Sequence, residues 1–382
     1  MPSSQSETFW RGRKVFVTGH TGFKGSWLSL WLQQLGAEVC GYSLEAPTTP
    51  NLFHVASVAD GMQSVIGNIC DTHSLQKAMK DFSPEIVFHL AAQPLVRQSY
   101  NDPVETYATN VVGTANVLEA VRSCDSVRAV VAVTTDKCYE NKEWLWAYRE
   151  NDRLGGHDPY SSSKACAELV VASYRSSFFS AKDAAKPVAL ASARAGNVIG
   201  GGDWAQDRLI PDIMQGFHQK KTVKIRNPRA VRPWQHVLEP LHGYLLLAER
   251  LYKDGAGFAE AWNFGPQDAD ARPVQWIVEH LAATWGPDAR WELDAAQHPH
   301  EAQALKLDWS KAAHKLGWHP VLHLEEALRW TADWYRAWND GARNDGTDMR
   351  AFTRSQIEQY TSLFARDKGT TPKAATPVKD FA

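Results

Sequence analysis

The sequence has few cysteines, and their spacing fits neither disulfide pairing nor zinc binding. Five occur among 382 residues, and no two form a CxxC pair: Cys40, Cys70, Cys124, Cys138 and Cys166. An odd number of scattered cysteines in a long chain is typical of a reduced cytosolic protein. The pattern argues against a disulfide scaffold, and we expect no metal site.

Long apolar runs and a surplus of one charge are also absent. No run of about 18 apolar residues occurs, so we expect no membrane span, and residues 1–7 lack the apolar core of a secretion signal. Lys and Arg total 41 and Asp and Glu total 43, which leaves a net charge of −2. This balance offers no electrostatic basis for nucleic-acid binding. An anionic small molecule needs only a local cluster of cations.

Short apolar runs alternate with helix-like segments through roughly the first 195 residues. We expect strands at residues 14–18, 38–42, 64–66, 86–90, 128–133 and 188–193, and helices at residues 23–35, 72–81, 104–122 and 160–179. The strands are almost continuously apolar, as expected when helices cover both faces of a sheet. The sequence therefore predicts an α/β protein with a Rossmann-type, doubly wound parallel sheet.

The pattern loosens after residue 195, where Gly, Pro and Trp become frequent and the helices shorter. We expect a dinucleotide-binding domain at 10–195, to which later segments near 231–262 return. Residues 196–365 are expected to form a smaller, mixed α/β, mainly substrate-binding region. Residues 366–382 have the composition of a disordered tail.

A glycine-rich turn joins the first expected strand to the first expected helix. Gly19, Gly22 and Gly25 have the spacing G-x-x-G-x-x-G. Glycines at this position let the backbone approach a pyrophosphate, and the helix N-terminus offers N–H donors to it. We therefore predict a dinucleotide site. Further residues expected to bind this cofactor, from the same turn and from the third and fourth strands, are His20, Phe23, Lys24, Asn68, Ile69, Leu90, Ala91 and Ala92.

The segment after the second strand favours NAD over NADP. Glu45 stands where a carboxylate can accept hydrogen bonds from the ribose hydroxyls, and no arginine immediately follows that strand to hold a 2′-phosphate.

Tyr160 and Lys164 carry the sharpest chemical signal. In Y-S-S-S-K the two side chains lie one helical turn apart and share a face. An ammonium beside a phenol favours the phenolate and lowers its pKa, so Tyr160 can accept a proton from a sugar hydroxyl. Both residues are expected to contact the nicotinamide cofactor. An ordinary solvated helix face is the alternative for such a pair.

Polar residues also end the fifth apolar strand, where Thr135, Asp136 and Lys137 follow one another. The carboxyl ends of parallel strands face the ligand crevice. A hydroxyl, a carboxylate and an ammonium at that edge supply groups for acid–base catalysis. A capping turn is the alternative.

Together the glycine turn, Leu90-Ala-Ala, T-T-D and Y-S-S-S-K resemble the extended short-chain dehydrogenases that act on sugar nucleotides, over residues 12–340. The T-D pair resembles the 4,6-dehydratases of that family. Lys137 stands where the dTDP-glucose enzymes have Glu, and with R-A-G-N-V-I-G-G-G-D and R-P-W-Q-H-V this departure resembles the CDP-glucose 4,6-dehydratases.

The resemblance implies that NAD oxidises C4 of the glucose, that water is lost across C5–C6, and that hydride returns to C6. Tyr160, Lys164 and Thr135 would serve the oxidation, and Asp136 would protonate the departing C6 hydroxyl. Lys137 would act as the C5 base when neutral, or stabilise the enolate while another group takes the proton. Arg97, Arg194, Asn197 and Arg232 are expected to bind the nucleotide sugar. Arg232 is the preferred ligand of the diphosphate, with Arg194, Arg226 and Arg229 as further candidates, and Arg97 is expected near the sugar.

Other functions on the same scaffold stay open. A 4-epimerase shares Tyr160 and Lys164 but needs no acid at C6, and a dehydratase of another nucleotide sugar differs only in the base it recognises. A non-catalytic dinucleotide sensor keeps the glycine turn but has no use for the tyrosine and lysine. The helices at 104–122 and 160–179 resemble those that form a four-helix dimer interface in the family, so we expect a homodimer.

Overall fold

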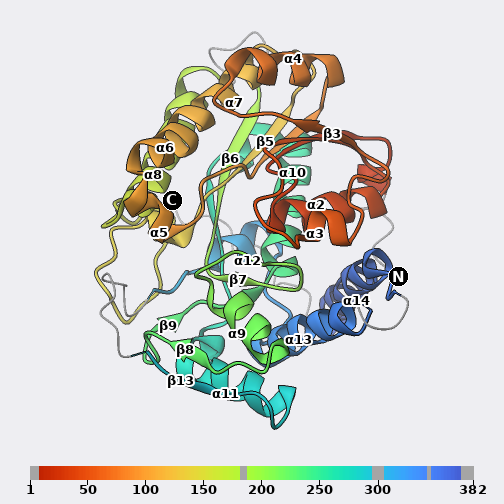
Figure 1. Cartoon of the computed structure of the whole chain (residues 1–382). Helices are drawn as coiled ribbons and strands as arrows, with labels where there is room; N and C mark the ends of the chain where they lie inside the picture. Colours follow the sequence, from red (N-terminus) through yellow and green to blue (C-terminus); the bar gives the residue numbers. More distant parts are fainter. Residues whose placement is uncertain (1–7, 181–186, 295–304, 342–345, 371–382) are drawn as a thin grey trace.

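A seven-stranded parallel sheet organises the chain, as the sequence predicts (Figure 1). The computed structural model describes residues 8–180, 187–294, 305–341 and 346–370. In sheet order the strands are β11 (Ala261–Phe264), β6 (Ala189–Ala195), β5 (Ala129–Val133), β4 (Ile86–His89), β1 (Lys14–Thr18), β2 (Glu38–Ser43) and β3 (Gln63–Ile66). The chain runs outward from β1 in one direction and from β4 in the other, so the strand order reverses between these two strands. A ligand crevice is expected at this reversal, beyond the carboxyl ends of the strands.

Successive residues of each strand enter two separate cores, which explains the continuous apolar runs. In β1, Val15 and Val17 join one core and Phe16 joins the other. The Phe16 core is covered by α4 (Thr72–Phe82), α7 (Gly113–Arg122) and α8 (Pro159–Ser177). The opposite core is covered by α2 (Phe23–Gln34) and α10 (Leu238–Asp254). Figure 1 shows these two sets of helices on either side of the sheet.

The helix expected over residues 104–122 is interrupted by a wide turn. The structure has α5 (Val96–Asn101), α6 (Pro103–Tyr107), a π-helical turn η1 (Ala108–Val112) and then α7. The backbone at the junctions Tyr107 and Val112 stays helical, so the axis continues through the π turn. Such turns are frequent at functional sites, and this one carries the buried Asn110.

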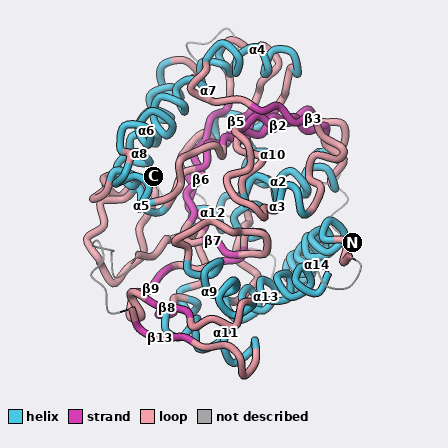
Figure 2. The backbone as a smooth tube through the Cα atoms, viewed as in Figure 1, coloured by secondary structure: helices cyan, strands magenta, loops and turns pink. Residues whose placement is uncertain are grey.

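The second region is built from short strand pairs and helices below the sheet (Figure 2). The pairs are β10–β7 and β13–β8, which are parallel, and β12–β9, which is antiparallel. The remaining elements are α3 (Leu52–Val55), η2 (Asp136–Cys138), β7 (Val198–Ile199), α9 (Leu209–His218), β8 (Val223–Ile225), β9 (Val231–Arg232), β10 (Gln235–His236), η3 (Gly255–Phe258), η4 (Asp268–Asp270), β12 (Arg272–Pro273), α11 (Val274–Trp285), β13 (Trp291–Leu293), α12 (Ser310–Leu316), α13 (Leu324–Gly341) and α14 (Met349–Thr370).

The last helix, α14, lies beside α13 and also contacts α2, so the chain returns to the dinucleotide-binding part. This helix runs on to Thr370, which corrects the expectation that residues 366–370 belong to a disordered tail. The rest of the expected tail, 371–382, lies outside the described residues.

Within the described chain, no helix is both long and apolar enough to cross a membrane. The same residues contain no group of three or more acidic, His or Cys side chains placed to hold a metal ion.

One buried carboxylate joins three separate segments of the lower core. Glu239 of α10 is fully buried and accepts the backbone N–H groups of Val321 and Leu322 at 2.9 and 2.6 Å. Its second oxygen accepts the hydroxyl of Tyr360 at 2.8 Å. Burial raises the pKa of Glu239 from its ordinary 4.5 to about 7, because the charged form loses its water.

This raised pKa makes a prediction about stability and pH. A carboxyl whose pKa is higher in the folded state stabilises the fold below its unfolded pKa and loses that contribution as pH rises toward the folded pKa. Wild-type stability should therefore fall, relative to Glu239→Gln, between about pH 4.5 and pH 7. Over this pH range the free energy of unfolding, measured in urea, should fall by on the order of 2 kcal/mol relative to the variant.

The matched control is Glu249→Gln, because Glu249 lies on the same helix in a more exposed ion pair with Lys253. The difference in unfolding free energy between Glu249→Gln and the wild type should change little over this pH range. A stability difference for Glu239→Gln that stays constant from pH 5 to pH 8 would contradict the assignment.

Candidate active site

A single large cavity opens beyond the carboxyl ends of the strands, with a volume of about 1680 Å³. It brings together most of the residues that the sequence singles out. The predicted residues that line it are Gly19, Gly22, Phe23, Lys24, Gly25, Glu45, Asn68, Ile69, Leu90, Ala91, Ala92, Arg97, Thr135, Asp136, Lys137, Tyr160, Lys164, Asn197, Arg226 and Arg232. His20, Arg194 and Arg229 do not line it.

The glycine turn packs backbone against backbone so closely that side chains would not fit at two of its glycines. A Cβ on Gly19, whose φ is +78°, would lie 2.7 Å from the backbone N of Ala91. A Cβ on Gly25 would lie 2.1 Å from the carbonyl oxygen of Gly19. Gly22, the N-cap of α2, makes no side-chain cap, so the first N–H groups of the helix face the cavity. The turn therefore fits the pyrophosphate of a dinucleotide.

His20 is a correction to the predicted cofactor site. Its side chain is fully buried on the far side of the turn, where Nε2 is 2.7 Å from Ser64 Oγ. The ring occupies the space that a side chain on Gly41 would need. Burial lowers the pKa of His20 to about 4, so the ring is neutral at neutral pH. His20 shapes the turn from behind and does not reach a ligand.

Lys24, by contrast, reaches into the cavity from the first turn of α2. Its Nζ lies 5.8 Å from the ring centroid of Tyr244. Burial, followed by the charges of Arg208 and Lys164, lowers the pKa of Lys24 to about 7, and Asp136 opposes this shift. The side chain therefore faces the reacting groups as well as the cofactor turn.

The catalytic pair is fixed on α8 by its first turn. Asp158 caps the helix by accepting the N–H of Ser161 at 2.9 Å, and Pro159 stands at the first helical position. Tyr160 N–H donates to Ser99 Oγ at 3.1 Å, and Lys164 Nζ donates to the carbonyl of Val133 at 3.1 Å. The helix is thereby tied to α5 and to the end of β5.

The chain alone does not lower the pKa of the phenol. Burial raises the pKa of Tyr160 to about 12, and the interaction with the Thr135 side chain only partly opposes this. Burial also lowers the pKa of Lys164 to about 8, against the attraction of Glu168. Both groups are therefore held closer to neutrality than in water, and activation of the phenol needs an added positive charge in the cavity.

Asp136 is poised as an acid at the end of β5. Thr135 caps the short helix η2 and donates its hydroxyl to Asp136 Oδ1 at 3.0 Å. The other oxygen, Oδ2, is buried without a partner in the described structure. Burial raises the pKa of Asp136 even though Lys137 and Arg232 lower it. A raised pKa makes a carboxyl beside a cavity better suited to give a proton to a leaving hydroxyl.

Arg194 is a second correction, because it belongs to a buried network behind the site. Its Nη2 is 2.7 Å from Glu168 Oε2, and both side chains are at most 4% exposed. Glu168 also accepts the hydroxyls of Thr134 and Ser192. This network locks α8 to β5 and β6 beneath Lys164. The arginine is structural here and cannot meet a substrate diphosphate.

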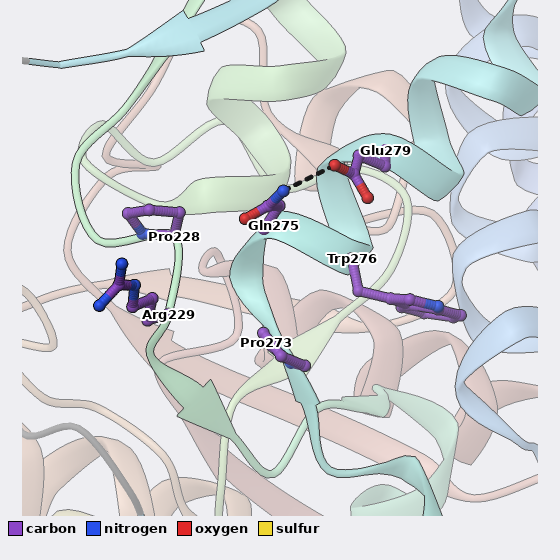
Figure 3. Close-up of a pocket in the computed structure, with 6 residues that line it drawn as sticks. All are labelled: Pro228, Arg229, Pro273, Gln275, Trp276 and Glu279. Carbon is purple, nitrogen blue, oxygen red and sulfur yellow. Dashed lines mark hydrogen bonds between the residues drawn. The ribbon is translucent and has the colours of Figure 1, made fainter.

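The remaining predicted arginines divide between two pockets. Arg232 lies at the inner cavity, where its charge lowers the pKa of Asp136, and Arg97 and Arg226 lie in its outer part. Arg229 instead lines a separate pocket of about 270 Å³ with Trp276 and the hydrogen-bonded pair Gln275 and Glu279 (Figure 3). The two pockets share no lining residue.

Two residues at the site, Arg208 and Asn110, were not predicted from the sequence. Arg208 lines the cavity in an ion pair of 2.8 Å with Asp203, and its charge acts on Tyr160. Asn110, in the π turn, donates to Ser163 Oγ at 2.9 Å and to the carbonyl of Gln93 at 3.1 Å. It supports α8 from below. Neither the π turn nor the ion pair produces a periodic pattern in the sequence. The one available signal was Asp203, the last residue of the motif R-A-G-N-V-I-G-G-G-D.

Comparison with known proteins assigns the scaffold. The chain is 55% identical over 361 residues to CDP-glucose 4,6-dehydratase of Salmonella typhimurium, which covers 94% of this chain and 99% of that protein. It is 24% identical to UDP-glucose 4-epimerase of Halalkalibacterium halodurans, over 88% and 99% of the two chains.

The solved structures agree on the fold. UDP-glucose 4-epimerase of Stenotrophomonas maltophila, crystallised with NAD and formylated UDP-arabinopyranose, superposes with a TM-score of 0.73 at 20% identity, over 86% of this chain and 99% of that one. The family model described as GDP-mannose 4,6 dehydratase matches residues 16–331. The chain belongs to this family of nucleotide-sugar dehydratases, which confirms the resemblance noted in its motifs.

Proposed function

We propose that this chain is a hydro-lyase that converts CDP-glucose to CDP-4-keto-6-deoxyglucose. The reaction oxidises C4 transiently with NAD, eliminates water across C5–C6 and returns hydride to C6. The observation that carries the proposal is the meeting of a dinucleotide turn, the pair Tyr160 and Lys164, and a buried acid, Asp136, in one cavity. The preference for cytidine rests on the relative that is 55% identical over almost the whole chain.

The cavity supports NAD as the cofactor. The turn from Gly19 to Gly25 and the start of α2 would hold the pyrophosphate, and Glu45 lines the cavity just beyond β2 where the ribose hydroxyls would lie. Asn68 and Ile69 would flank the adenine. When bound, oxidised NAD supplies the hydride acceptor and an added positive charge near the phenol.

The chain's own residues move the protons. Tyr160 takes the proton of the C4 hydroxyl, assisted by the hydroxyl of Thr135 and the charge of Lys164. Asp136 gives its proton to the departing C6 hydroxyl. Lys137 Nζ lies 5.9 Å from the centroid of the Tyr160 ring. It would serve C5 either as the base that takes the proton or by stabilising the enolate charge while another group takes that proton. Arg232, whose charge acts on Asp136, and Asn197 would hold the diphosphate from the side of the sugar.

Asp136 favours a dehydratase over an epimerase on the same scaffold. Inverting C4 requires no proton at C6, so a buried carboxyl with one unpartnered oxygen facing the sugar region would have no use in an epimerase. Its raised pKa suits a group that must donate a proton. A non-catalytic sensor would need neither this acid nor the tyrosine.

Tyr160→Phe should abolish turnover because it removes the proton acceptor. We expect the rate of 4-keto product formation from CDP-glucose and NAD, followed by its ultraviolet band, to fall about 10²- to 10⁴-fold. The control is Tyr174→Phe on the same helix, whose hydroxyl pairs with Glu119 at 2.9 Å outside the cavity. Unchanged turnover of every nucleotide sugar tested with the Tyr160 variant would contradict the mechanism.

Asp136→Asn should separate binding from chemistry. The amide keeps the shape but cannot give up a proton, so kcat for product formation should fall about 10²- to 10⁴-fold. Binding of CDP, measured by calorimetry, should stay within about threefold, because the acid acts only on the sugar. The assignment fails if kcat is retained, or if CDP binding falls as much as turnover does.

We also propose a division of labour along the chain. Residues 10–195, joined by the returning segment near 231–262 that supplies all of α10 and the start of the edge strand β11, would bind the cofactor. Residues 196–365 would mainly bind the nucleotide sugar.

A cytosolic location is supported by the five cysteines, none of which is in a disulfide.

We propose that the protein is a homodimer through the helices on the Phe16 side of the sheet. α6, η1 and α8 lie together and expose apolar side chains. Val104 is 77% exposed, Val112 55% and Leu169 59%. A neighbouring set of such side chains is typical of a protein interface. A second copy would bury these residues around the two-fold axis.

Leu169→Glu should therefore convert the dimer to a monomer, because a charge at the centre of the interface loses its water without a partner. Light scattering coupled to size exclusion measures the mass directly. Leu293→Glu is the control, since Leu293 is 62% exposed on β13, away from these helices. A wild-type monomer at micromolar concentration would contradict the proposal.

A further inference from the structure

One carboxylate in the outer cavity holds two arginines at once. Asp207 Oδ1 lies 3.0 Å from Arg97 Nη1 and 3.2 Å from Arg226 Nη1. Arg226 also donates through Nη2 to the carbonyl oxygen of Asp207 at 3.4 Å. The three residues come from α5, from the loop before α9, and from the segment after β8, so the carboxylate connects the dinucleotide-binding part to the substrate region.

These three side chains lie in the cavity, where a ligand can reach them. Arg97, Arg226 and Asp207 all line it, with side-chain exposures of 38%, 22% and 44%. Asp207 has a left-handed backbone with φ of +60°. Asp, Asn and Gly adopt this conformation most readily, so the position suits a short polar residue. The carboxylate is presented to the cavity by the loop and is not packed into the core.

The charges in this part of the cavity are balanced before any ligand arrives. Arg97 and Arg226 bring two positive charges, and Asp207 and the neighbouring Asp212, which also lines the cavity, bring two negative ones. Guanidinium groups bind carboxylates and phosphates in the same geometry. A diphosphate entering here competes directly with Asp207 for both arginines.

We propose that Asp207 is an internal substitute for the substrate diphosphate, which displaces it from Arg97 and Arg226 on binding. The inference rests on the proposed function in one respect, namely that the substrate carries a nucleoside diphosphate. The arrangement favours ligands with two phosphates, because a ligand must bring enough charge to replace the carboxylate on two arginines. A nucleoside without phosphate leaves the Asp207 pairs in place.

The direct test is Asp207→Asn, which keeps the size and the backbone preference of the residue and removes its charge. Calorimetry on the full chain should show CDP binding about fivefold tighter or more, because the competitor for both arginines is gone. Cytidine binding should stay unchanged. CDP binding that is unchanged or weaker in the variant overturns the proposal.

Two further variants guard against indirect effects. Asp207→Gly tolerates the same φ and should tighten CDP binding as the asparagine does, so both variants must agree. Asp254→Asn is the charge-matched control, because Asp254 forms an ion pair of 3.2 Å with Arg250 at 43% exposure on α10, outside the cavity. CDP affinity should be the same in Asp254→Asn as in the wild type.

A double-mutant cycle distinguishes release of the arginines from simple repulsion by the carboxylate. If Asp207 acts through its two partners, the gain from Asp207→Asn disappears in a background of Arg97→Gln and Arg226→Gln. A gain that persists in that background shows repulsion alone and overturns the proposal. These measurements need no turnover. Tighter CDP binding without any dehydration of CDP-glucose would therefore refute the proposed reaction and leave this inference standing.

Discussion

The ion pair between Glu168 and Arg194 is the interaction on which the geometry of the site depends. It lies behind the cavity at the junction of α8, β5 and β6, and both side chains are almost completely buried. Glu168 also receives the hydroxyl of Thr134, the residue just before Thr135 and Asp136. Removing either partner would leave a charge buried without compensation, which costs about 3–5 kcal/mol. The pair therefore fixes the helix that carries Tyr160 and the strand end that carries the acid in one relative position.

Burial sets the protonation of every central group in the same direction, toward the neutral form. The pKa of Tyr160 and of Asp136 is raised, and the pKa of Lys164 and of Lys24 is lowered. The common cause is loss of water, which penalises whichever form is charged. The protonation of these groups therefore responds to a ligand that adds charge to the cavity. This explains why the lysine alone does not ionise the phenol.

The sheet and the catalytic pair could be predicted from the sequence because each has a local signal. Strands buried on both faces give apolar runs, and residues four apart on a helix share a face, which placed Tyr160 and Lys164 correctly together in the cavity. The same rule extends one more turn to Glu168, a signal that was present and not used. The family resemblance supplied the roles of Thr135 and Asp136, which residue types alone left open.

The errors have a shared origin, because a sequence gives the charge of a residue but not its partner. Arg194 sits in a recognisable motif, yet a buried glutamate takes its guanidinium. His20 sits in the glycine turn, yet the missing side chain of Gly41 leaves space for its ring on the opposite side. The π turn at Ala108–Val112 has no periodic signature and shows only in the backbone. In each case a tertiary contact decides the direction of the side chain.

The distribution of charge along the cavity gives the substrate its orientation. Around the reacting groups, basic side chains outnumber acidic ones even though burial weakens the charge of some of them. Lys24, Lys137, Lys164, Arg208 and Arg232 line the cavity together with Asp136 and Asp203. At the outer end, Arg97 and Arg226 are already matched by acidic side chains. An anionic ligand is therefore drawn toward the inner cavity by unbalanced charge, while a diphosphate can bind at the outer end only by exchange. In the proposed reaction the neutral sugar would lie between Tyr160 and Asp136, with its diphosphate toward Arg97 and Arg226.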